Sequence, residues 1–204
     1  MAKTILAFDE NDSVLGSFFQ SCKENLDSFF AQIDIQPTFL NSNTLNDLAI
    51  EIVTKDISSF VFGAYSHGDN DCLLKKTSIP YISLTNSSNF KNSFFYTFSC
   101  STGKELGLNL IKNGCHCYIG YNDIVAIWST YQKPFIECAN YGIIQFFYGE
   151  ESHTIINQMK EKYNDEIDNM YKQDFLIASI LRDNRDGLII LGKNISLINF
   201  TNNL

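Results

Sequence analysis

The sequence predicts an α/β domain: a three-layer sandwich in which a largely parallel central sheet lies between helices. Short apolar runs typical of buried strands alternate with longer segments whose apolar residues recur at helical spacing. Of the 204 residues, 45% are hydrophobic and 19% are charged, which suffices for one large core. No repeat, low-complexity run or linker interrupts the chain, so we expect a single domain over residues 1–204.

The first half of the chain is expected to hold five elements in this order: a strand at residues 3–8, an amphipathic helix from Ser13 to Phe30, an edge strand at 33–40, a helix over 45–53 capped by Thr44, and a buried strand at 57–65. The first and last strands are continuous apolar runs bounded by polar residues. The first helix repeats its apolar residues at helical spacing and begins beside Asp and Ser residues that can cap it. Pro37 lacks an amide proton, which suits a strand at the edge of a sheet.

The second half continues the alternation with these elements: a hairpin of two short strands within 72–85, a buried strand at 94–98, a helix over 106–111, a strand at 115–121, three helices beginning near residues 130, 152 and 175, and closing strands at 188–191 and 195–200. Asn113 and Gly114 form a good helix C-cap. Pro134 falls in the opening turns of a helix, where a missing amide proton costs little. Strands that alternate with helices in this way predict parallel pairing.

Charge and composition exclude several classes of function. The chain has 15 basic and 23 acidic residues, a net charge of −8, and no basic stripe for phosphates, so we expect no nucleic-acid partner. No run of eighteen apolar residues occurs, so we expect no membrane span. The first eight residues run directly into acidic ones and do not form an export signal. The six cysteines are therefore expected to be reduced in a cytoplasmic compartment.

A histidine and a cysteine follow two of the expected buried strands. His67 comes directly after the strand at 57–65, and Cys100 comes just after the strand at 94–98. Reactive groups in parallel sheets collect at the carboxyl ends of strands, and neighbouring strands lie about 5 Å apart. A thiol with a pKa near 8.5 is mostly protonated at neutral pH, so a nucleophilic cysteine needs a base such as histidine. We therefore expect His67 and Cys100 to form a catalytic dyad.

Backbone amides near the dyad suit a developing oxyanion. Cys100 is expected to open a helix, where free N–H groups favour negative charge. Gly68 allows the backbone beside His67 to approach a ligand closely, so the amides of Gly68 and Cys100 are the expected oxyanion donors. Taken singly, each residue also has a structural interpretation: Cys100 as a small buried hydrophobe and His67 as a loop residue.

The residues around the dyad resemble a known family. The segments Phe62–Gly68, which ends in His-Gly, and Tyr96–Gly103, which carries Cys-Ser-Thr-Gly, are similar to the blocks of caspase-like cysteine peptidases, above all bacterial CHAT domains, metacaspases and gingipains. The expected hairpin at 72–85 and the closing strand at 188–191 lie where these folds carry such elements. The resemblance covers most of residues 57–192, although only the two blocks are specific.

The resemblance implies a caspase-like fold and an endopeptidase that cleaves a protein or peptide substrate through an acyl-thioester, after activation by a partner protein or by processing. It requires no cofactor. Metacaspases usually carry an Asp two residues before the cysteine, in a pocket for a basic substrate residue, but this chain has Phe98 there. Asp123 and Asp69 are the expected replacements for this acid, and Ser99 is a further candidate substrate-binding residue.

Other interpretations stay open. A caspase-like module kept only for binding, without catalysis, has the same residues. A hydrolase related to glutamine amidotransferases would pair Cys100 with a later histidine, His116 or His153. Cys115 and Cys117 are separated by one residue, which is shorter than the usual zinc-binding spacing, so we expect two buried thiols and no metal. An acid pair after the first strand is similar to a response-regulator receiver, but no Asp follows the strand at 57–65.

Overall fold

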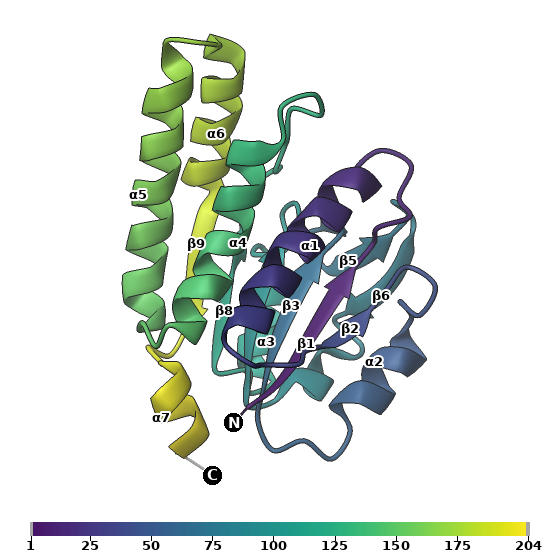
Figure 1. Cartoon of the computed structure of the whole chain (residues 1–204). Helices are drawn as coiled ribbons and strands as arrows, with labels where there is room; N and C mark the ends of the chain where they lie inside the picture. The colour runs from purple at the N-terminus through teal and green to yellow at the C-terminus, as the bar shows by residue number, and fades with distance from the viewer. Residues whose placement is uncertain (1, 203–204) are drawn as a thin grey trace.

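The computed structural model describes residues 2–202 and has the expected α/β class (Figure 1). Its central sheet contains six strands in the order β2-β1-β3-β7-β8-β9, with these bounds: β1 Lys3–Phe8, β2 Thr38–Leu40, β3 Phe60–Tyr65, β7 Ser93–Phe98, β8 Cys117–Tyr121 and β9 Leu188–Gly192. All neighbouring pairs are parallel except β8 and β9, which are antiparallel. The carboxyl ends of five strands therefore meet at one edge, the upper edge in Figure 1.

The central strands are apolar on both faces because helices cover both faces. Every residue of β3 and of β7 is buried, and the two strands pair in register from Phe60 with Ser93 to Tyr65 with Phe98. Side chains alternate across the sheet, so Phe94 belongs to one hydrophobic cluster and Phe95 to the other. This alternation fixes which face each strand-end residue occupies.

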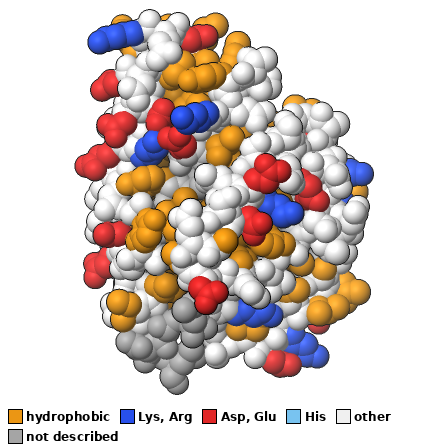
Figure 2. Space-filling model, in the orientation of Figure 1, with side chains coloured by type: hydrophobic (Ala, Val, Ile, Leu, Met, Phe, Trp, Pro, Cys, Tyr) orange, Lys and Arg blue, Asp and Glu red, His pale blue; other side chains and the backbone are white. Residues whose placement is uncertain are grey.

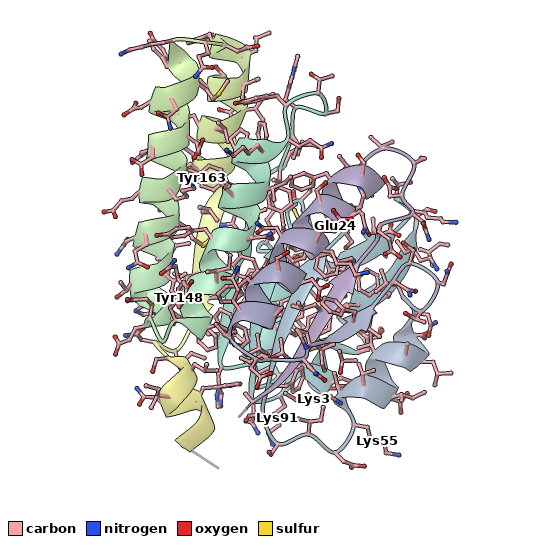
Figure 3. The ribbon with its side chains drawn as sticks, in the orientation of Figure 1. Lys3, Glu24, Lys55, Lys91, Tyr148 and Tyr163 are labelled. Carbon is pink, nitrogen blue, oxygen red and sulfur yellow. The ribbon has the colours of Figure 1, made fainter. Side chains whose placement is uncertain are left out.

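One face carries the longer helices. They are α1 Gly16–Gln32, α4 Lys133–Phe147, α5 Ser152–Tyr171 and α6 Phe175–Gly187, of which α1 and α4 lie in front of the sheet in Figure 1. Phe146 of α4 stacks on Phe94 of β7 with ring centroids 3.9 Å apart. Tyr163 of α5, labelled in Figure 3, is fully buried, and its hydroxyl lies 3.0 Å from that of Tyr121 at the end of β8. The helical layer thus reaches the edge where the strands end.

The other face is covered by shorter elements. They are α2 Asp47–Thr54, the 3₁₀ helix η1 Ser87–Phe90 and α3 Leu106–Lys112. A small antiparallel sheet of three strands adjoins them, with the order β4 His67–Asp69, β5 Cys72–Lys75 and β6 Ile79–Ser83. The expected hairpin within 72–85 is therefore present, and it is extended by a third strand that begins at His67.

Two local expectations from the sequence were wrong. Residues 195–200 do not form a strand, because the chain turns into helix α7 Leu197–Asn202 and the Phe200 amide donates to the Ser196 carbonyl at 2.8 Å. The second helix is capped by Asn46, whose side chain accepts the Ala49 amide, while Thr44 closes the turn that precedes it. Both errors follow from local hydrogen bonding that apolar spacing does not report.

None of the helices within residues 2–202 combines the length and the apolar character that crossing a membrane requires.

Candidate active site

His67 and Cys100 line the same small cavity at the carboxyl edge of the sheet. Its volume is about 10 Å³, room for about one water molecule. Six more residues complete its wall: Leu15, Phe19, Ser66, Phe98, Ser99 and Val125. Both predicted catalytic residues are half-buried, so part of each residue is exposed while the rest packs against the protein.

Cys100 lies on a sharp turn that is tied to the end of β8. The Ser101 amide donates to the Asp123 carbonyl at 3.0 Å, and the Gly103 amide donates to the Tyr121 carbonyl at 2.8 Å. Ser101 has a φ of 57°, a left-handed conformation that is costly for a residue with a side chain. Cys100 does not open a helix as expected, because α3 begins only at Leu106. Helix-dipole stabilisation of its thiolate is therefore excluded.

The thiol of Cys100 contacts the backbone of Val125. The Val125 amide donates to Sγ at 3.4 Å, and Sγ lies 3.5 Å from the Val125 carbonyl oxygen. Burial raises the pKa of the Cys100 thiol above its usual value, and amide hydrogen bonds from Val125 and Cys100 offset this only in part. The carboxylates of Asp123 and Asp69 raise this pKa further. The sulfur is therefore protonated at rest, and a base must remove its proton.

An aspartate that sequence reasoning did not assign faces the histidine. Asp12 Oδ1 lies 3.2 Å from His67 Nε2, and the Asp12 side chain is only 2% exposed. The ring N–H is poorly aligned with this oxygen, so the contact is an ion-pair distance rather than a well-formed hydrogen bond, and Nε2 has no other partner among the described residues.

Asp12 is held in place by the start of α1. The same Oδ1 accepts the amides of Val14 at 2.8 Å and Leu15 at 2.7 Å. Burial alone would raise the pKa of Asp12, but the Leu15 and Val14 amides and the His67 imidazole outweigh it, so the pKa lies below its usual value. Asp12 is therefore a carboxylate at neutral pH and can stabilise a positive charge on His67.

Three further contacts fix the position of His67. The Ser66 hydroxyl donates to the His67 carbonyl at 3.0 Å and lies 2.8 Å from the Tyr81 hydroxyl of β6. The ring of Phe19 meets the imidazole edge-on, with centroids 6.3 Å apart. A Cβ on Gly68 would lie 2.6 Å from the Cys100 carbonyl oxygen, so only glycine allows β4 to approach the cysteine turn this closely.

Of the three expected substrate-binding residues, only Ser99 lines the cavity that Cys100 and His67 share. Ser99 lines it, is buried, and its Oγ accepts the Thr97 hydroxyl at 2.8 Å. Asp69 is exposed and accepts the Asn70 amide. Asp123 is exposed, accepts the Ile124 amide, and lines a second cavity of about 270 Å³ together with Asp183.

The other two histidines lie away from this cavity. His116 packs edge-on against Phe200. His153 is the second residue of α5, and its backbone amide donates to the Asn194 side chain. Neither lines the cavity that Cys100 and His67 share. Of the three histidines, only His67 therefore shares a cavity with Cys100.

Cys115 and Cys117 are buried, and burial raises the pKa of their thiols to about 11 and about 12. Within residues 2–202, no three His, Cys, Asp or Glu side chains are grouped so that they could hold a metal ion.

Asp12 had a weak sequence signal. It is the last acid in the Asp9–Asp12 segment directly after β1, and β1 pairs with the strand that leads to His67. Its contact with His67 depends on the turn before α1, and no spacing rule predicts that turn. Comparisons with known proteins do not add a relative: no protein-family model and no curated protein matches this sequence.

Proposed function

We propose that this protein is a cysteine endopeptidase in which Cys100 is the nucleophile and His67 the general acid and base. The observation that carries the proposal is the shared cavity, which both side chains line at the edge of the sheet. We assign Asp12 as the positioning residue, because its carboxylate faces Nε2 of the imidazole at 3.2 Å. A protein or peptide is the substrate, and no cofactor takes part.

The reaction proceeds in two halves. His67 takes the thiol proton of Cys100, and the sulfur attacks the carbonyl carbon of the scissile peptide bond. His67 then gives this proton to the amide nitrogen, the C–N bond breaks, and the new amine leaves behind an acyl-thioester on Cys100. In the second half His67 removes a proton from water, the resulting hydroxide attacks the thioester, and the thiol is regenerated with release of the carboxylic acid.

The backbone supplies the remaining charge stabilisation. We assign the amides of Gly68 and Cys100 to the oxyanion, because the close approach of Gly68 to the cysteine turn brings both residues to one place. The raised pKa of Cys100 supports a general-base mechanism over a preformed thiolate. In this mechanism the Cys100 thiol loses its proton only when a substrate is bound.

Activation by a partner protein or by processing belongs to the proposal. The cavity has room for only about one water molecule, and the Val125 backbone holds the sulfur from one side. The same observation favours the second candidate, a caspase-like module that binds partners without catalysis.

Labelling by an electrophilic peptide probe separates these two candidates. The probe is expected to label Cys100 in the wild-type chain, to lose this label in Cys100→Ala, and to label His67→Ala far more slowly. Cys72→Ala is the matched control, because Cys72 is the other half-exposed cysteine and lies outside the cavity. Absence of label on Cys100 even after limited proteolysis would support the non-catalytic module.

The compartment is a further part of the proposal. All six cysteines are free thiols, four of them buried, which supports a reducing cytoplasm. Labelling of intact protein with and without reductant, followed by mass analysis, tests it: an inter-cysteine disulfide in freshly isolated protein would contradict it.

A further inference from the structure

The cavity next to Cys100 determines which substrate residue can lie on the N-terminal side of the cleaved bond, the P1 position. During attack the substrate carbonyl carbon lies about 3–3.5 Å from the sulfur, and the side chain of that residue is attached one bond further away. This P1 side chain must therefore enter space that adjoins Cys100. The cavity lined by Cys100 and His67 is such a space.

The wall of this cavity is apolar apart from the dyad. Phe19, Phe98 and Val125 are nearly fully buried, and Leu15 is half-buried. The two serines of the wall already have partners: Ser66 bonds to Tyr81 and the His67 carbonyl, and Ser99 accepts from Thr97. A charged P1 side chain would enter this space without a partner, which is strongly unfavourable.

The depth of the cavity limits the size of the side chain. Phe98 is part of its wall, and the Phe98 ring packs between those of Phe18 and Tyr121, with centroids 5.2 Å and 5.5 Å away, which limits its movement. The space of about 10 Å³ holds about one water molecule, so a methyl group fits it better than a Leu or Phe side chain does. Given the peptidase function proposed above, we propose that the site accepts substrates with a small apolar P1 residue, alanine above all.

The acidic cavity beside Asp123 does not serve the same carbonyl. Val125 lines the cavity at Cys100, whereas its two neighbours Ile124 and Ala126 line the cavity that contains Asp123 and Asp183. The backbone of this segment therefore separates the two spaces. Asn184 keeps it in place, because its side chain accepts the Ala126 amide at 3.0 Å and donates to the Ala126 carbonyl at 2.7 Å. A basic side chain bound at Asp123 would lie across this segment from the sulfur.

Four fluorogenic peptides that differ only at P1, with Ala, Leu, Arg or Asp, test the proposal on the full chain. We expect kcat/KM for the Ala peptide to exceed each of the others at least tenfold, since one methylene in an apolar pocket changes it by about 10- to 200-fold. An Arg peptide cleaved as well as the Ala peptide would overturn the proposal and favour Asp123.

Two variants sharpen the test. Leu15 is half-buried, and Leu15→Ala removes part of the cavity wall and so widens the cavity. This variant is expected to shift the ratio of kcat/KM for the Ala and Leu peptides toward Leu by about tenfold. Asp183→Asn is the matched control, because it removes charge from the acidic cavity alone, and the P1 preference is expected to stay unchanged. The assignment of P1 to the cavity at Cys100 would be contradicted if Asp183→Asn lowered cleavage of the Arg peptide while Leu15→Ala left the Ala-to-Leu preference unchanged.

Failure of the peptidase proposal is distinguishable from failure of this one. If chloroacetamide, which has no P1 side chain, labels Cys100 in a His67-dependent manner but the Ala-containing peptide chloromethyl ketone labels no faster than its Arg counterpart, the P1 assignment is wrong and the nucleophile stands. If neither reagent labels Cys100 in a His67-dependent manner, the peptidase function itself is wrong, and the P1 assignment with it.

Discussion

Asp12 links the start of a helix to the imidazole through a single oxygen. Its Oδ1 accepts two amides at the start of α1 and also faces Nε2 of His67. Because the amides keep the pKa of Asp12 low, the carboxylate remains charged while His67 changes its protonation state during turnover. One residue thus contributes to folding and, in the proposed mechanism, to catalysis, and a substitution that separates the two roles is informative.

Asp12→Asn is the substitution that separates them. Asparagine keeps an oxygen for the two amides but loses the charge, so we expect stability to change little and kcat to fall about 100-fold. The pH–rate profile is expected to change shape, which a purely structural role would not cause. Asp27→Asn, an exposed position on α1, is the control, and an unchanged profile in Asp12→Asn would rule out the positioning role.

The pH dependence of Cys100 alkylation reports the state of its thiol. Burial raises the pKa of this thiol, so at neutral pH its thiolate fraction is smaller than that of an unfolded cysteine with a pKa near 8.5. We expect the rate of modification by iodoacetamide to rise through pH 7 and 8 and to level off only above about pH 8.5. Mass analysis of the Cys100 peptide measures it, and a plateau already below pH 7 would indicate a thiolate–imidazolium pair instead.

Among the structural elements, the small sheet that carries His67 depends on one buried carboxylate. Asp9 at the end of β1 is fully buried, and its oxygens accept the Ser42 hydroxyl at 2.8 Å and the Lys76 amide at 2.7 Å. Lys76 and Thr77 form the turn between β5 and β6, both with positive φ. Asp9 therefore ties this strained turn to the central sheet, and through β5 it supports β4.

Asp9→Ala is expected to lower the free energy of unfolding by about 2 kcal/mol, because it leaves the Lys76 amide without its acceptor, whereas the Ser42 hydroxyl can still donate to Glu10. Urea unfolding measures the change. Glu10→Gln is the matched control: Glu10 is half-buried and also accepts from Ser42, but glutamine can keep that bond, so a loss below about 1 kcal/mol is expected. Equal losses in both variants would contradict the special role of Asp9.

Long and strongly patterned elements were predictable from the sequence, and elements set by local hydrogen bonds were not. The runs that became β3 and β7 are apolar throughout, and α1 repeats apolar residues at helical spacing, so burial alone determines them. Residues 195–200 also contain apolar residues, yet the chain there enters helix α7 and does not form a strand. The spacing of apolar residues does not specify which backbone groups bond to each other, so this helix was not predicted. The same limit applied to the active site: His67 and Cys100 follow patterned strands, whereas Asp12 lies in a turn.

On the scale of the whole molecule, the candidate active site lies against the larger of two hydrophobic clusters. Phe98 and Val125 of the cavity wall belong to the cluster that also holds buried residues of α1, α4, α5 and α6. The far ends of α5 and α6 instead expose Tyr171, Phe175 and Leu176, where Figure 2 shows apolar side chains gathered at the top of the molecule. The helical layer thus packs against the residues of the site and also exposes apolar side chains where α5 ends and α6 begins.

This packing predicts that the site and the helical layer unfold together. Trp128, the single tryptophan, follows the segment that contacts Cys100, so its fluorescence reports the site, whereas far-UV circular dichroism reports the helices. Phe146→Ala removes a ring that stacks on Phe94, and we expect it to cost about 3–5 kcal/mol and to move both urea transitions equally. Leu108→Ala, at an exposed position of α3, is expected to change stability by less than about 0.5 kcal/mol. If Phe146→Ala shifted the dichroism transition but left the fluorescence transition in place, the helices would be a separate folding unit, and the single cooperative domain expected for residues 1–204 would be wrong.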